Sequence, residues 1–162
     1  MNREEQQQRF IEWAYAFDNL LWKAARSFAT GADQDDLHQE LLLALWKSIP
    51  AFRGDAKAST FVYRVAYNYA LTWTRKSKRK EVGLEQAVGV AARAATGGTE
   101  LQLEQMYEQI RELKPLDRTL ILLYLDDIGY REMSDITGLS ESNVGVRLNR
   151  VKKLLAQRLQ EV

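Results

Sequence analysis

The chain has 162 residues, and its 23 Lys and Arg nearly balance its 22 Asp and Glu, giving a formal net charge of +1. This length allows one domain or two small ones, and 46% hydrophobic with 28% charged residues is an ordinary globular composition. Cysteine is absent, which excludes a disulfide framework and a thiolate metal site and fits a reducing, cytoplasmic environment. The polar N-terminus does not resemble a secretory signal, and no apolar run approaches the ~20 residues that cross a bilayer, so we expect no membrane insertion.

The charges are segregated along the chain. Acidic side chains gather between Asp33 and Glu40, whereas basic ones gather between Arg75 and Lys80 and again between Arg147 and Arg158. One surface for a protein partner and two for a polyanion would explain this pattern, and chance clustering is the alternative.

The first third of the chain predicts two helices. Apolar residues at spacings of three and four predict a helix from about Arg3 to Ala29, with Gly31 as its stop. A second helix is expected from about Gln34 to Ile49, capped by Asp33 and ended by Pro50. Its predicted core stripe is Leu37, Leu41, Ala44, Leu45 and Ile49.

The other side of this second helix combines acids with large apolar residues. The helix dipole favours acids in the first turn, which is one explanation for them. The other explanation is a docking surface for a basic helix, with Leu43 and Trp46 as apolar anchors. The single histidine, His38, has no cysteine or second histidine near it in the sequence, so we predict no metal site and no cofactor.

Residues 52–80 predict a third helix that follows a polar turn around Gly54. One face can be buried: it holds Phe61, Val62, Val65, Ala66, Tyr69 and Trp73. The opposite face holds Tyr63, Arg64, Tyr67, Asn68, Leu71 and Arg75, and a basic cluster completes the helix with Lys76, Lys78, Arg79 and Lys80. Aromatic rings stack on unpaired bases and cations pair with phosphates, so this surface suits single-stranded or partly melted nucleic acid. An amphipathic helix with a solvated basic end is the alternative.

Residues 81–100 are small, rich in Gly and Ala, and lack aromatics. We predict a flexible linker there, with transient helix around 84–95, because a 20-residue loop is long for one compact domain. The prediction is therefore an all-helical chain with two small helical domains, at residues 1–80 and 101–162.

The second half predicts a helix-turn-helix. A helical stripe from Leu101 is followed by a helix starting near Pro115, a break at 126–129, and a short helix over 130–137 with Tyr130, Met133 and Ile136 inward. Gly138 closes that helix and Ser140 caps a long last one. In such motifs the second helix fits the major groove of DNA. The expected contact residues are Ser140, Ser142, Asn143, Arg147 and Arg150, the alternative being a helical hairpin with a charged outer face.

Four segments, in order, resemble the extracytoplasmic-function (ECF) group of bacterial sigma factors, in which only regions two and four are kept. Asp35-Asp36-Leu37-His38-Gln39-Glu40 with Leu45-Trp46 is similar to the family's core-binding helix. Phe52-Arg53-Gly54 with residues 61–68 is similar to its minus-ten segment. Residues 113–118 resemble the start of region four, and residues 130–155 resemble its helix-turn-helix.

This resemblance implies a binding protein and not an enzyme: a factor that joins RNA polymerase core and directs transcription from promoters. The clamp of the largest subunit would be bound by Asp35, Asp36, Leu37, Gln39, Glu40, Leu43 and Trp46. The minus-ten strand would be captured and melted by Lys57, Ser59, Thr60, Tyr63, Arg64, Tyr67, Asn68, Arg75 and Lys76, with one flipped base held by Asn68, Ser59 and Lys57. The minus-thirty-five element would be read by Arg131, Ser140, Ser142, Asn143, Arg147, Arg150 and Lys153. The second domain would also meet the flap of the second-largest subunit, the linker would follow the RNA exit path, and an anti-sigma factor is an expected partner.

The chain departs from the family pattern at several places. Phe61 replaces the usual Trp, and Lys114 replaces the first Pro of a usual pair. Gly145 and Val146 stand where the family often has Lys or Arg and Ser, so phosphate contact should be weaker there. Promoter preference is therefore open.

Three other functions compete with this interpretation. A helix-turn-helix regulator that works without polymerase would explain the second half but leave the acidic helix without a role. A metal-dependent nuclease would use Asp35, Asp36 and Glu40, although no further acids obviously converge on them. A structural helical adaptor would bind no DNA.

Overall fold

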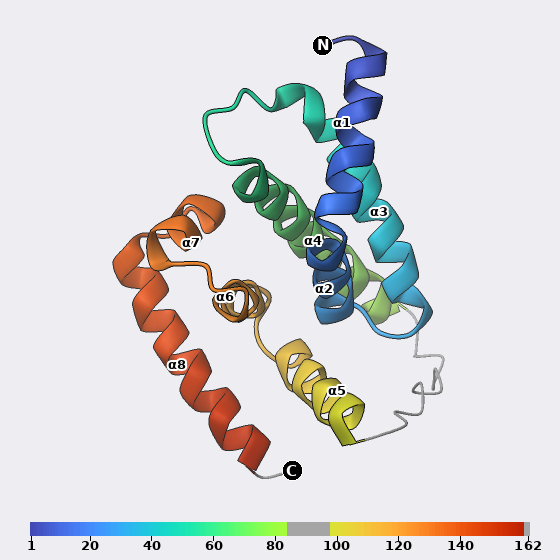
Figure 1. Cartoon of the computed structure of the whole chain (residues 1–162). Coiled ribbons are helices and arrows are strands. Elements are labelled where there is room, and N and C mark those ends of the chain that lie inside the picture. Colours follow the sequence, from blue (N-terminus) through green and yellow to red (C-terminus); the bar gives the residue numbers. More distant parts are fainter. Residues whose placement is uncertain (84–97, 161–162) are drawn as a thin grey trace. The chain divides into compact units, whose positions relative to one another are not determined.

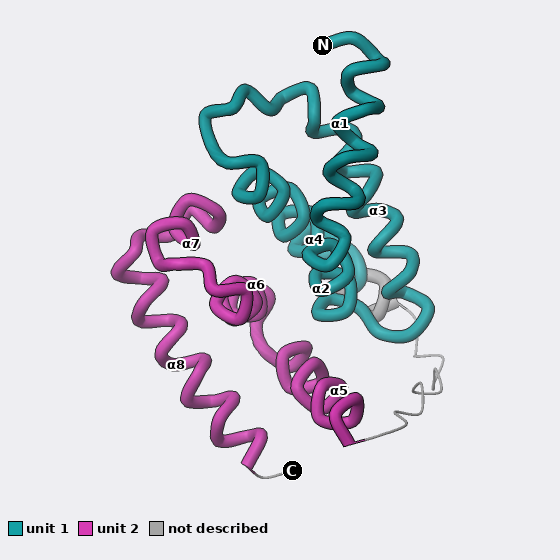
Figure 2. Tube along the Cα trace, in the orientation of Figure 1, with its two compact units in different colours: residues 1–87 teal, residues 88–162 magenta. Residues whose placement is uncertain are grey.

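A computed structural model describes residues 1–83 and 98–160, and in these ranges the regular structure is helical with no strand (Figure 1). The chain divides into two compact units, residues 1–87 and 88–162 (Figure 2). The prediction of an all-helical chain with two helical domains is confirmed. None of the helices in the described ranges has both the length and the apolar character that crossing a membrane requires.

Unit 1 is a helical bundle with α3 at its centre. Its elements are α1 (Arg3–Ala16), α2 (Asp18–Phe28), α3 (Ala32–Ser48), the 3-10 turn η1 (Ile49–Ala51) and α4 (Ala58–Gly83). Helix α3 packs against α1, α2 and α4, and α4 also packs against α2. The most deeply buried side chains of this core are Leu21, Ala24, Ala25, Leu37, Leu41, Leu45, Ile49, Val62 and Ala70.

Two predicted boundaries in unit 1 are wrong. The single helix expected from Arg3 to Ala29 is broken at Phe17, where the backbone has φ −109° and ψ 21°. Apolar spacing runs on across this break, so periodicity alone could not locate it. Asp33 does not cap α3, because the helix already begins at Ala32 after Gly31, whose φ is 57°. Asp33 lies in the first turn instead, where the helix dipole stabilises its negative charge.

Unit 2 contains α5 (Gly98–Arg111), α6 (Pro115–Leu125), α7 (Tyr130–Thr137) and α8 (Glu141–Gln160), with α8 packed on the other three. The helix starts and ends predicted at three residues are confirmed. Pro115 occupies the first turn of α6, and Gly138 ends α7 with φ 80°. The Ser140 hydroxyl accepts a hydrogen bond from the Asn143 backbone N–H at 3.1 Å and so caps α8.

The inward placement predicted for Tyr130 is wrong. Met133 and Ile136 are buried as expected, but Tyr130 is 40% exposed. It stands at the first position of α7, and its ring lies against Gly145 of α8. The absence of a side chain at Gly145 makes room for the ring on the helix surface.

The predicted linker can be followed only at its ends. Residues 81–83 belong to α4 and residues 98–100 to α5. Residues 84–97, which include nearly all of the predicted transient helix, lie outside the described residues. The domain boundaries at 80 and 101 therefore stay predictions.

Candidate nucleic-acid interface

The tyrosines expected on the open face of α4 are part of the core. Tyr63 is 8% exposed, Tyr67 is 2% exposed and Thr60 is 5% exposed. The two tyrosine rings are stacked with centroids 6.1 Å apart, and the Tyr67 ring lies 6.2 Å from that of Phe28 in α2. Because α4 packs against α2 as well as α3, it buries a wider arc than the apolar stripe indicates. These three residues are not on a surface that a base could reach.

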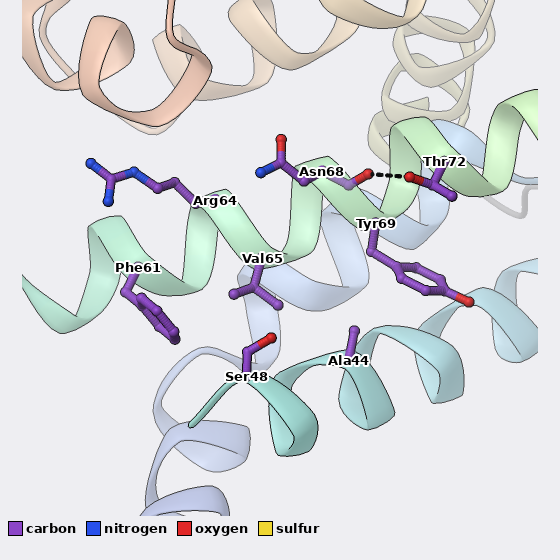
Figure 3. Close-up of a pocket in the computed structure, with 8 residues that line it drawn as sticks. All are labelled: Ala44, Ser48, Phe61, Arg64, Val65, Asn68, Tyr69 and Thr72. Carbon is purple, nitrogen blue, oxygen red and sulfur yellow. Dashed lines mark hydrogen bonds between the residues drawn. The ribbon is translucent and has the colours of Figure 1, made fainter. Parts of the chain in front are cut away.

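An open pocket of about 380 Å³ lies between α3 and α4. In Figure 3, Phe61, Val65 and Tyr69 extend from α4 toward α3, whereas Arg64 and Asn68 extend from the side of α4 that faces away from α3. The complete lining is Ala44, Ser48, Phe61, Arg64, Val65, Asn68, Tyr69 and Thr72. This shallow, open pocket thus brings apolar and aromatic side chains next to several polar groups.

Asn68 is exposed at this pocket. One turn further along α4, the Thr72 hydroxyl donates to the Asn68 backbone carbonyl at 3.0 Å (Figure 3). This hydrogen bond uses the backbone of Asn68 and not its carboxamide. The side chain presents an amide donor and a carbonyl acceptor, the pair of groups that can recognise the edge of a base.

Tyr69 connects the pocket to the acidic helix α3. Its hydroxyl donates a hydrogen bond to Glu40 Oε2 at 2.7 Å. Burial, together with this bond to a carboxylate, raises the pKa of Tyr69 to about 12, so the phenol is neutral at ordinary pH. The sequence placed Tyr69 only in a buried stripe and missed this contact. The available signal was chemical: a partly buried tyrosine hydroxyl usually has a hydrogen-bond partner.

The acidic side of α3 forms a second candidate surface. Its exposed members are Asp35, Asp36, Gln39, Glu40 and Leu43, and the Leu43 side chain is 51% exposed. Trp46 is half-buried, because the ring of Phe10 in α1 packs edge-on against it at 5.5 Å. Leu37 has no exposed surface and belongs to the core. Its predicted place on a partner-binding surface is therefore wrong, while its predicted place in the core stripe is confirmed.

His38 is occupied by contacts within unit 1. Its ring stacks on Trp22 with centroids 3.7 Å apart, and its Nε2 lies 3.7 Å from Asp18 Oδ1. Burial lowers the pKa of His38 below its usual 6.5, although Asp18 opposes that shift. Over the described ranges, His, Cys, Asp and Glu side chains form no group of three or more that could hold a metal ion.

The basic part of the predicted minus-ten surface is spread along α4 and the residue that precedes it. Lys57, Arg75 and Lys76 are exposed, and Ser59 is half-buried near the start of the helix. An α-helix rises ~1.5 Å per residue, so Ser59 and Asn68 stand roughly 13 Å apart along the axis. One base therefore cannot contact both side chains, and the predicted three-residue site for a single flipped base is not assembled. The side chains of Lys78, Arg79 and Lys80 lie outside the described part of the chain.

All but one of the predicted contact residues on α8 are exposed. Ser142, Asn143, Arg150 and Lys153 are exposed, as are the cap residue Ser140 and Arg131 of α7. Arg147 is turned back toward α6, where its Nη1 lies 3.4 Å from Asp117 Oδ1. This ion pair ties α8 to α6 within unit 2. Sequence spacing could not reveal it, because the two residues are 30 positions apart.

Comparison with known proteins accounts for both units. The Sigma-70 region 2 family matches residues 13–80, and the Sigma-70 region 4 family matches residues 103–155. The chain belongs to the ECF group of the sigma-70 family. As a sigma factor it directs promoter-specific initiation by RNA polymerase, and it acts by binding and not as an enzyme.

Individual relatives align with most of this chain and support the assignment. It is 26% identical over 156 residues to the ECF RNA polymerase sigma factor SigM of Mycobacterium tuberculosis, covering 90% of this chain and 78% of that protein. It is 25% identical over 159 residues to SigW of Bacillus subtilis, covering 90% of this chain and 85% of the relative.

Two solved structures share the fold. The sigma factor RpoE of Bartonella quintana, crystallised with the anti-sigma factor NepR, aligns with a TM-score of 0.76 and 21% identity over 96% of this chain and 98% of that one. CnrH, solved with the cytosolic domain of CnrY, aligns with a TM-score of 0.68 and 24% identity over 96% of this chain and 90% of that one.

Proposed function

We propose that the two units divide the work of initiation between them. The acidic side of α3 binds the clamp of the largest polymerase subunit, with Asp35, Asp36, Gln39 and Glu40 facing basic groups and Leu43 with Trp46 as apolar anchors. Support comes from the half-exposed Leu43 among exposed carboxylates, because an apolar side chain at such a position gains energy only when a partner covers it.

The pocket beside α4 is proposed to capture an unpaired base of the minus-ten element. Asn68 would hydrogen-bond to the base edge at the rim of the pocket, and Phe61 with Val65 would supply apolar contact inside it. Binding the extruded base would offset the cost of unstacking and so help to melt the duplex. Arg64, Arg75 and Lys76 would pair with phosphates along the helix. Lys57 and Ser59 would contact the nucleotide next to the captured base. The open pocket next to Asn68 is the single observation that carries this proposal.

Unit 2 is proposed to read the minus-thirty-five element in the major groove. The exposed residues Ser142, Asn143, Arg150 and Lys153 on α8 are the proposed contacts, with Arg131 of α7 on the backbone. Arg147 would reach DNA only by leaving Asp117. The same unit would meet the flap of the second-largest subunit. An anti-sigma factor, of the kind crystallised with the Bartonella quintana relative, would hold the protein inactive in the cytoplasm.

The minus-ten assignment is tested by separating core binding from strand opening. Asn68→Ala should leave affinity for polymerase core within twofold and should lower open-complex formation at least tenfold, measured by permanganate reactivity of melted thymines. Asp36→Lys should abolish pull-down of core, and open complexes should be lost with it. Asn19→Ala, which changes an exposed asparagine on α2, is the matched control and should change neither.

Three results would contradict the proposal. Equal loss of core binding and melting in Asn68→Ala would contradict the role proposed for the pocket in capturing a base. Intact core binding by Asp36→Lys would contradict the role proposed for the acidic side of α3 in binding core. Specific duplex binding by the free chain, with no gain on adding core, would favour the regulator that works without polymerase.

A further inference from the structure

Val146 stands out on the surface of α8. Its side chain is 64% exposed, more than any other large apolar side chain in the described part of unit 2. The next most exposed, Leu101 at 48% and Leu125 at 47%, lie on other helices. A solvent-exposed valine gains nothing from burial in the free protein.

The choice of valine also costs helix stability. A β-branched residue restricts its own χ1 angle in a helix, and glycine at the preceding position weakens the helix by roughly 1 kcal/mol relative to alanine. Gly145 has a packing reason, because a Cβ there would lie 3.3 Å from Cε2 of Tyr130. Val146 has no comparable reason among the described contacts. Departures from local rules that bring no packing gain are expected at functional sites.

The position of Val146 on the helix indicates what it faces. Val144, Leu148, Val151 and Leu155 are buried and define the inner side of α8. Ser142, Val146, Asn149 and Lys153 follow one another at spacings of four, three and four, so they share one outward stripe. Val146 therefore stands in the first turns of the second helix of a helix-turn-helix, between polar and basic residues. In this motif those turns contact base edges.

We propose that Val146 is a specificity residue that contacts the C5 methyl group of a thymine in the minus-thirty-five element. Thymine is the base that carries a methyl group in the major groove, and small apolar side chains recognise it by direct contact. Polar neighbours on the same stripe would fix the flanking bases and phosphates. This inference rests on the proposed role of α8 in reading duplex DNA.

The test removes the same methyl group from the DNA. Full-length protein with core polymerase selects templates from a duplex library randomised at the minus-thirty-five element, and the selected promoter is resynthesised with deoxyuridine in place of each thymine in turn. At one position, deoxyuridine should weaken holoenzyme binding about fourfold, the affinity equivalent of one buried methyl group. Val146→Ala should bind the thymine template about fourfold more weakly and should lose its sensitivity to deoxyuridine.

Controls keep the outcome clear. Val146→Thr retains a methyl group in nearly the same shape and should keep the sensitivity, as should Leu159→Ala, which trims another exposed apolar residue of α8. Val146→Ala must bind the deoxyuridine template within twofold of the parent, which shows that α8 is intact. The inference is overturned if no thymine position responds to deoxyuridine, or if Val146→Ala responds as the parent does. Failure of the holoenzyme to select any promoter would instead refute the proposed function.

Discussion

Replacing two adjacent residues of α4 should separate structure from function. Tyr67 is 2% exposed and packs against Tyr63 and Phe28, whereas its neighbour Asn68 is exposed at the pocket. Truncating a buried aromatic ring to alanine costs about 3–5 kcal/mol, and a whole domain is stable by only about 5–15 kcal/mol. Tyr67→Ala should therefore lower the unfolding midpoint of unit 1 by roughly 15 °C or more. Asn68→Ala should shift this midpoint by less than about 3 °C, because substitutions of surface residues usually change the free energy of unfolding by no more than ~0.5 kcal/mol.

Tryptophan fluorescence can follow unit 1 alone in the full-length chain. All four tryptophans, Trp13, Trp22, Trp46 and Trp73, lie in residues 1–87. Thermal or urea unfolding monitored at their emission thus reports the unit that contains α4, and far-UV circular dichroism reports both units. A Tyr67→Ala protein that unfolds like the parent but fails to capture single-stranded promoter DNA would refute the burial argument and restore this ring as a stacking surface.

Two further substitutions test the polar contacts. Asp117→Asn should lower the free energy of unfolding of unit 2 by about 1 kcal/mol, because it removes the charge that Arg147 faces at 3.4 Å; circular dichroism should shift while tryptophan emission does not. Tyr69→Phe should cost less than ~1 kcal/mol at pH 7 by removing the donor to Glu40. Because the native pKa of Tyr69 is raised from 10.0 to about 12, its stabilisation is complete below pH 10 and is lost as pH rises through about 12. The parent should therefore lose stability more steeply than Tyr69→Phe in that window, and equal slopes would contradict the assigned bond.

The helix-turn-helix was predictable because its signals are local. Pro115, Gly138 and Ser140 each act on the backbone within a few residues, through a fixed φ, a left-handed φ and an N-cap hydrogen bond. The bounds of α7 and the start of α8 agree with the prediction for that reason. The break at Phe17 has no such local signal, and the prediction missed it.

The candidate site was less predictable because it depends on which helices meet. A period of 3.6 residues identifies one buried stripe, but α4 packs on two helices, so Tyr63 and Tyr67 are buried along with the stripe. Residue type alone also could not distinguish Arg150, which is exposed, from Arg147, which pairs with Asp117 on α6. The pocket and the Tyr69–Glu40 bond join α3 to α4 and exist only after packing.

Two glycines of unit 2 allow a paired test of the turn that connects α7 to α8 in the helix-turn-helix. Gly138 has φ 80°, where an L side chain is strained, whereas Gly129 has φ −77°, which any residue adopts. A Cβ at either position would meet no atom within 4 Å, so packing does not distinguish them. Gly138→Ala should therefore destabilise unit 2 by about 1–2 kcal/mol through backbone strain. Gly129→Ala should change stability by less than ~0.5 kcal/mol, because the gain from restricting the unfolded chain is offset by alanine being a poorer N-cap of α7 than glycine.

The two variants should also differ in binding, because only Gly138 controls how α7 leads into α8. Gly138→Ala should weaken binding of the holoenzyme to a selected minus-thirty-five element, with tryptophan emission on unfolding unchanged, and Gly129→Ala should bind like the parent. The measurements are urea unfolding by circular dichroism and duplex binding at fixed salt, since phosphate contacts make affinity salt-dependent. Destabilisation of the same size in both variants would mean that the turn at Gly138 does not require its left-handed backbone. The angle between the two helices would then have to be set by the packing of Met133 and Ile136 against α8.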